Sequence, residues 1–229
     1  MDNSPPQHTN RQYEEDLRGL RSGLLKMGGV VERQIADAIE SLVERNTGRA
    51  RETIERDAEV NRMDTEMDER CIRLLALHQP AASDLRFITT GLKITTDLER
   101  IGDNAVNICE RAIELNEEPQ LKPYIDIPRM AEIAQSMVKD SLDALMREDP
   151  ALAREVIERD DEVDQLNYQI YRELLSYMAE DPQTIPRATR ILFVSKYLER
   201  IADHATNIAE MIVYMVKGST IRHMEKKKP

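Results

Sequence analysis

Acidic side chains recur at intervals of three and four residues in two segments of this 229-residue sequence. Residues at that spacing share one face of an α-helix, so each segment would form a stripe of carboxylates interrupted by an amide. Carboxylate and amide oxygens are the hard ligands that Mg²⁺, Ca²⁺, Mn²⁺ and iron accept. The two stripes consist of Asp57, Asn61, Asp64 and Asp68, and of Glu99, Asp103, Asn107 and Glu110.

Both stripes have a second copy further along the chain. Like charges four residues apart destabilise a helix by about 0.2–0.5 kcal/mol per pair, and a bound cation would relieve this. The alternative is a solvated helix face whose charge is balanced by Arg100, Arg111 and Arg200. If the helices pack side by side, the stripes of each copy would converge. The second copy consists of Asp160, Asp164 and Asn167, and of Glu199, Asp203, Asn207 and Glu210.

The copies belong to an internal duplication of the whole chain. Nine of eleven residues are identical between Ala50–Val60 and Ala153–Val163, at an offset of 103. Nine of thirteen are identical between Leu98–Glu110 and Leu198–Glu210, at an offset of 100. Such self-similarity indicates a repeated structural unit. The change of offset places a three-residue length difference between residues 76 and 89, and we expect a loop to absorb it.

Apolar residues within each repeat recur with a helical period. Leu98, Ile101, Ala105 and Ile108 are spaced three and four apart, which is typical of a helix packed against other helices. Alternation with period two is absent, so the sequence predicts an all-α fold. Asn46 suits a helix N-cap, as does Asp149, which is followed by Pro150. The expected helices are 20–46, 48–77, 83–116, 128–147, 150–179 and 185–217.

The composition narrows the class of protein. Lys and Arg number 32 and Asp and Glu 43, so the net charge of −11 argues against a nucleic-acid binder. No apolar run is long enough to span a membrane, so we expect no membrane insertion. The polar segment 1–10 contains no signal-peptide pattern, and Cys71 and Cys109 are interpreted as core thiols; both features favour a cytoplasmic location. We also expect a charged surface without a large apolar patch.

A carboxylate-bridged di-metal oxidase is one enzymatic alternative. Such sites use a histidine three residues after a glutamate, projecting into a helix bundle. None of the four histidines follows a glutamate at that spacing, and the acidic stripes point away from the apolar seam. His204 could be a ligand, but its counterpart in the first repeat is Asn104, which favours a surface histidine. Nucleotide-binding glycine loops and nucleophile elbows are also absent from the sequence.

The chain resembles the PhoU family, the regulatory accessory proteins of bacterial phosphate-specific transport. The resemblance rests on Leu98–Asp103 and Leu198–Asp203, with the sequences LERIGD and LERIAD, and on Gln79–Arg86. It implies two tandem three-helix bundles related by pseudo-twofold symmetry. The expected organisation is an N-terminal mobile tail at 1–12, repeats at 13–118 and 119–218, and a basic C-terminal tail at 219–229. That last tail is either solvated or a patch for anionic partners.

The family also implies multinuclear metal sites, at an acidic residue followed four positions later by Asp. Three of the four copies in this chain have the acidic residue and the Asp. The fourth, Asp57–Asn61, carries an amide in place of the second carboxylate, so this position offers an oxygen without charge. The implied cations are divalent metals or iron. The matching copies are Glu99–Asp103, Asp160–Asp164 and Glu199–Asp203.

The function implied by the resemblance is regulatory and not enzymatic. PhoU-like proteins act as negative regulators of the phosphate-starvation response and of phosphate uptake. The implied partners are the phosphate sensor histidine kinase and the ATPase subunit of the phosphate ABC transporter, and a homodimer is expected. The alternative is a carboxylate-rich metal-binding or metal-buffering helical adaptor without a role in phosphate signalling.

Overall fold

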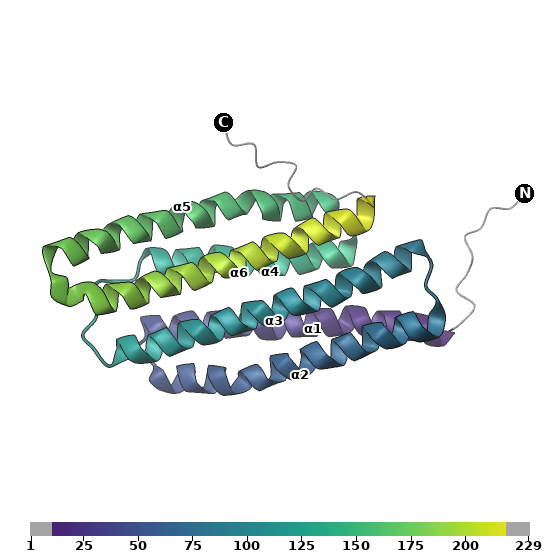
Figure 1. Cartoon of the computed structure of the whole chain (residues 1–229), viewed down its shortest axis with the longest axis horizontal. Helices are drawn as coiled ribbons and strands as arrows, with labels where there is room; N and C mark the ends of the chain where they lie inside the picture. Colours follow the sequence, from purple (N-terminus) through teal and green to yellow (C-terminus); the bar gives the residue numbers. More distant parts are fainter. Residues whose placement is uncertain (1–10, 219–229) are drawn as a thin grey trace, which may run out of the picture.

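The computed structural model describes residues 11–218, and these form six α-helices and one short 3-10 turn. Figure 1 shows the helices running along the long axis of the molecule, with those of the first half of the chain on one side and those of the second half on the other. The all-α prediction is therefore confirmed. The elements are α1 (Arg11–Val43), α2 (Thr47–His78), α3 (Ala82–Asn116), α4 (Asp126–Arg147), α5 (Pro150–Glu180), η1 (Pro182–Thr184) and α6 (Ile185–Lys217).

Each group of three helices is a bundle, and two of its helices join it to the other bundle. Helices α1, α2 and α3 pack on one another, as do α4, α5 and α6. The bundles meet where α3 packs on α6 and α1 packs on α4. Among the described residues, α2 and α5 contact only their own bundle, so they form the outer flanks (Figure 1). Each repeat therefore has one outer helix and two inner helices.

The predicted apolar seam forms the core. Leu98, Ile101 and Ile108 of α3 are fully buried, and Leu198, Ile201 and Ile208 of α6 occupy the same positions in the second bundle. Burial of large aliphatic side chains contributes roughly 1.5–3 kcal/mol each, and this drives the helices together. Cys71 and Cys109 are buried free thiols, and burial raises the pKa of each to about 12.

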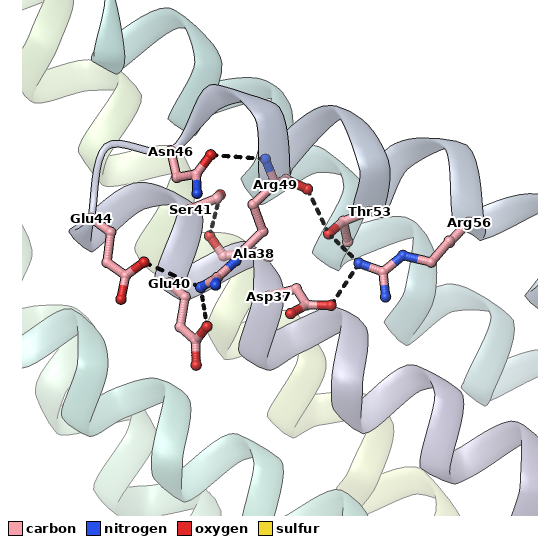
Figure 2. Close-up of polar contacts among 9 residues, drawn as sticks. All are labelled: Asp37, Ala38, Glu40, Ser41, Glu44, Asn46, Arg49, Thr53 and Arg56. Atoms are coloured by element: carbon pink, nitrogen blue, oxygen red, sulfur yellow. Dashed lines mark hydrogen bonds and ion pairs between the residues drawn. The ribbon is translucent and has the colours of Figure 1, made fainter.

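Caps and ion pairs fix the α1–α2 and α4–α5 turns. Asn46 Oδ1 accepts a hydrogen bond from Arg49 N at 3.0 Å (Figure 2). Asp149 accepts from two backbone amides at the start of α5, with Pro150 in the first turn, so both predicted caps are confirmed. Arg56 donates to Asp37 at 2.7 Å, as Figure 2 also shows. The second bundle repeats this pair between its own α4 and α5.

Two predictions about the ends of elements were wrong. Helix α1 begins at Arg11 and not near residue 20, so Arg11 and Gln12 belong to a helix and not to a tail. Tyr13 holds this extension, because it is buried and donates to Asp84 Oδ2 at 2.8 Å. The tail predictions for residues 1–10 and 219–229 lie outside the described residues.

The three-residue difference between the repeats also lies elsewhere than predicted. We expected a loop to absorb it, but the α2–α3 connection is only Gln79–Ala81, whereas 181–184 separate α5 from α6. At the offset of 100, Ala82 corresponds to residue 182, so α3 begins three residues earlier than α6. The extra residues therefore lengthen helices, and the Tyr13–Asp84 hydrogen bond anchors the longer α3.

Candidate functional site: two carboxylate clusters

The acidic stripes of α2 and α3 converge, as the sequence predicted. Asp57 and Asp64 of α2 lie within electrostatic reach of Glu99 on α3. Burial, followed by the charge of Asp103, raises the pKa of Glu99; Asp64 and Asp57 add to the rise, and Arg100 opposes it. We call Asp57, Asn61, Asp64, Glu99 and Asp103 the first cluster.

Two amides occupy the oxygens of Asp57 in the first cluster. Asn61 Nδ2 donates to Asp57 Oδ2 at 2.9 Å, and Gln34 Nε2 of α1 donates to Asp57 Oδ1 at 3.2 Å. Gln34 is 2% exposed and its Oε1 accepts no hydrogen bond. Gly102 leaves room for this contact, because a Cβ there would lie 3.1 Å from Gln34 Oε1 and would crowd it. Gln34 was not predicted as a site residue, and its one sequence signal is a long amide within the apolar pattern of α1.

The second cluster lies between α5 and α6 and consists of Asp160, Asp164, Asn167, Glu199 and Asp203. Partial burial raises the pKa of Asp203, and the charges of Glu199 and Asp164 raise it further, while Lys196 and His204 oppose the rise. Glu199 is ion-paired with Lys196. Asn167 Oδ1 accepts a hydrogen bond from Ser195 Oγ at 2.9 Å. Asp164, Glu199 and Asp203 therefore lie close together on the α5–α6 face, and Asp160 precedes Asp164 by about one helical turn on α5.

The clusters carry the same number of carboxylates in different places. The first has an amide at Asn61 and a carboxylate at Asp64, whereas the second has a carboxylate at Asp164 and an amide at Asn167. Each cluster thus keeps four carboxylates and one amide on its pair of helices. Asp64 and Asn167 both belong to the acidic stripes predicted from the sequence. Because each pair of helices converges, the carboxylate lost at one position of a cluster is replaced by a carboxylate at the other.

Basic side chains partly neutralise both clusters. Arg100 Nη1 donates to Asp103 at 2.9 Å and its Nε lies 3.4 Å from Glu99, as the solvated-face alternative predicted. Arg111, also named in that alternative, pairs with Glu110 and Glu114. Within residues 11–218, no three His, Cys, Asp or Glu side chains are arranged to hold a metal ion. Arg100 and Lys196 instead pair with carboxylates of the two clusters.

The donor chemistry of both clusters nevertheless fits a hard cation. Each offers carboxylates from two adjacent helices, and in each at least one carboxyl has a raised pKa because it is partly buried and because its neighbours carry like charge. Oxygen-rich sites of this kind suit Mg²⁺, Ca²⁺, Mn²⁺ or iron. The unpartnered oxygen of Gln34 adds a further neutral donor beside Asp57 in the first cluster.

His78 and His204 each contact an aspartate on another helix. His204 Nδ1 lies 2.8 Å from Asp97 Oδ1, so it joins α6 to α3 between the repeats and is not the surface histidine that we predicted. His78 Nε2 lies 3.6 Å from Asp16 and its ring packs against Tyr13. Both residues therefore contribute to contacts between helices.

Comparison with known proteins identifies the family to which this chain belongs. The family model described as the PhoU domain matches residues 24–112 and again residues 127–212. The chain belongs to the PhoU family. The two matches cover the two bundles one at a time, so the family unit corresponds to one three-helix repeat.

Relatives in the PhoU family align along nearly the whole chain. A phosphate-specific transport system accessory protein PhoU homolog from Pseudomonas putida is 43% identical over 218 residues, which is 95% of this chain and 85% of that protein. The homolog from Aquifex aeolicus is 44% identical over 209 residues, covering 91% and 95%. The crystal structure of PhoU from Pseudomonas aeruginosa superimposes with a TM-score of 0.87 at 43% identity, covering 90% of this chain and all of that one.

Proposed function

We propose that this chain is a non-enzymatic negative regulator of the phosphate-starvation response and of phosphate uptake. It acts between the phosphate-specific ABC transporter, through its ATPase subunit, and the phosphate sensor histidine kinase. The observation that carries the proposal is the 43% identity, over 95% of the chain, to a protein named for phosphate-specific transport. In ample phosphate the regulator holds the kinase in its non-activating state and restrains uptake.

The fold supports docking to large partners. The two bundles present helix faces longer than 30 residues, about 50 Å each, on a rigid core. No helix among residues 11–218 combines the length and apolarity that crossing a bilayer needs. In this proposal, contact with the transporter uses surface helices, and the regulator acts in the cytoplasm, where the ATPase subunit and the kinase domains are accessible. A homodimer would double the number of such faces.

The test is a reporter driven by a phosphate-starvation promoter, in cells that lack this protein and grow in ample phosphate. Constitutive expression that is reversed by restoring the gene is the expected result. Expression that stays repressed, in cells without a second PhoU-like gene, contradicts the proposal. Phosphate uptake measured in the same cells should rise in the deletion strain.

The carboxylate clusters are proposed as binding sites for divalent cations or iron. The first would use Asp57, Glu99 and Asp103 with the amide oxygen of Asn61, and the second Asp160, Asp164, Glu199 and Asp203. A bound cation supplies positive charge that cancels the repulsion among the carboxylates. The chain's own contribution is to hold these oxygens on two rigid helices and to move Arg100 and Lys196 aside.

The proposed metal sites also fit a second candidate function, a metal-buffering adaptor. The combined change Glu99→Ala with Glu199→Ala separates the two functions when metal content and reporter output are measured together in a folded protein. Loss of metal with regulation intact favours the adaptor. Loss of regulation with the fold retained favours a signalling role for the clusters.

A further inference from the structure

An apolar groove lies on the outer face of the second bundle, between α5 and α6. Its volume is about 410 Å³, within the range of about 300–1,000 Å³ typical of binding sites for small ligands. Tyr168, Tyr171 and Phe193 line it and are 63%, 46% and 47% exposed. Phe193 stacks on Tyr197, with ring centroids 6.2 Å apart. We call the lining residues Asp164, Tyr168, Tyr171, Leu192, Phe193 and Lys196 the aromatic groove.

The first bundle has no such apolar lining at the equivalent positions. Tyr168 and Tyr171 correspond to Thr65 and Asp68, and Phe193 corresponds to Lys93. The buried residues around these positions correspond in both bundles, so the aromatic side chains are not needed for the fold. Exposed aromatic residues that the core does not require are typical of binding surfaces.

The acidic side chains beside the groove favour a basic occupant. Asp164 belongs both to the groove and to the second cluster, which continues into Asp160, Glu199 and Asp203. Lys196 also lines the groove, but it is paired with Glu199. A second copy of this chain would bring its own acidic cluster, and a net charge of −11, against the same surface. Repulsion between like charges disfavours that occupant, whereas a basic partner is attracted.

The length of the groove suits a helix. Asp164 and Tyr171 are seven residues apart, or about 10 Å along α5, which is two helical turns. A helix lying in an apolar groove inserts side chains at positions i, i+3 or i+4, and i+7, over this distance. Anchoring of this kind relies on a few buried apolar contacts, with charged contacts at the rim.

We propose that the aromatic groove binds a helical segment of a partner protein that inserts apolar side chains among Tyr168, Tyr171 and Phe193 and places Lys or Arg beside Asp164. This inference rests on the proposed regulatory function, because it assigns a surface to one of the partners proposed there. It makes the second bundle the docking side of the molecule, and the first bundle lacks the equivalent site.

The test exchanges groove residues for those of the first repeat. The double variant Tyr171→Asp with Phe193→Lys leaves the net charge unchanged, and both new residues already occur on the equivalent surface of the first bundle. The matched control is Leu77→Glu, which replaces an exposed apolar residue with its counterpart Glu180. The probes are the purified cytoplasmic region of the sensor kinase and the purified transporter ATPase, each titrated by biolayer interferometry.

At least one probe should bind the unmodified chain, and the double variant should weaken its Kd tenfold or more, as expected for the loss of central anchors. The control should bind within twofold, and binding should weaken as NaCl rises. Thermal melting should show the double variant folded. Unchanged binding by the double variant, binding by neither probe, or a homodimer that dissociates in the double variant would each overturn the inference. The promoter reporter in deletion cells judges the regulatory proposal separately.

Discussion

Ile101 in α3 is fully buried, and so is Ile201 at the equivalent position in α6. Arg56 pairs with Asp37 in the first bundle at 2.7 Å, and Arg159 pairs with Asp140 in the second at 2.6 Å, at an offset of 103. On the outer surface the bundles differ, because Phe193 and Tyr171 lie where the first bundle has Lys93 and Asp68. The positions that hold each bundle together are alike in the two repeats, whereas the positions that line the aromatic groove differ.

Shortening one buried side chain in each repeat tests whether the two cores contribute equally to stability. Ile101→Ala and Ile201→Ala should each lower the free energy of unfolding by about 2–5 kcal/mol, because each leaves a cavity at a fully buried site. Urea denaturation of both variants measures the loss. Equal losses within about 1 kcal/mol would support equivalent packing, and a loss in only one bundle would break the comparison.

Adding a carboxylate to each cluster tests the exchange of charge between the repeats. Asn61→Asp and Asn167→Asp each give a cluster five carboxylates, and each should tighten Mn²⁺ binding about tenfold through added attraction. Isothermal titration calorimetry measures the affinity. The combined change Asn61→Asp with Asp64→Asn copies the second pattern into the first bundle and should keep the affinity near that of the unmodified chain. An unchanged Kd in both single variants would contradict a role for these positions.

Removal of the N-cap of α2 or of α5 should lower the stability of the protein by a smaller amount, which differs between the two repeats. Asn46→Ala and Asp149→Ala should each destabilise the protein by about 0.5–2 kcal/mol. Asp149 accepts from two backbone amides and Asn46 from one, so the second change should cost more. Thermal unfolding of the two variants compares them. Equal losses would mean that the second hydrogen bond of Asp149 contributes nothing measurable.

The pH dependence of stability should show the smallest effect. The pKa of Glu99 is raised in the folded chain, so the folded state binds more protons than the unfolded state as the pH falls from neutral. Acidification toward the folded pKa therefore stabilises the protein through this group. Glu99→Gln should stabilise the metal-free chain at pH 7 by less than about 1 kcal/mol, and this gain should shrink toward pH 4.5.

Chemical denaturation at several pH values measures this difference. Asp203→Asn should behave in the same direction, because the pKa of Asp203 is also raised. A gain for Glu99→Gln that stays constant from neutral to acid pH would show that the charge of Glu99 is not its cause.

The sequence predicted features that depend on helical periodicity. The bounds of α6 and the convergence of the acidic stripes follow from residue spacing, because one face of a helix must be buried. Contacts between distant residues could not be predicted in this way. The start of α1 is held by the Tyr13–Asp84 hydrogen bond, and Gln34 packs closely against Gly102, which has no Cβ.

The aromatic groove was not predicted from the sequence. Tyr168 and Tyr171 are on the flank of the α5 stripe, and Phe193 is on the flank of the α6 seam. In sequence each is an isolated exposed aromatic residue, which is common in proteins. Only the packing of α5 against α6 brings them together. Comparison of the two repeats could have given a hint, since the first repeat has Thr, Asp and Lys at these places.

The packing of α3 on α6 also has a consequence during synthesis of the chain. The ribosome completes the first bundle while the later helices, Asp126–Lys217, are still to be made. At roughly 5–20 residues per second, those 92 residues take on the order of 5–20 s. During that interval, the sides of α1 and α3 that later pack against α4 and α6 are exposed to water. They are then accessible to chaperones that bind nascent chains.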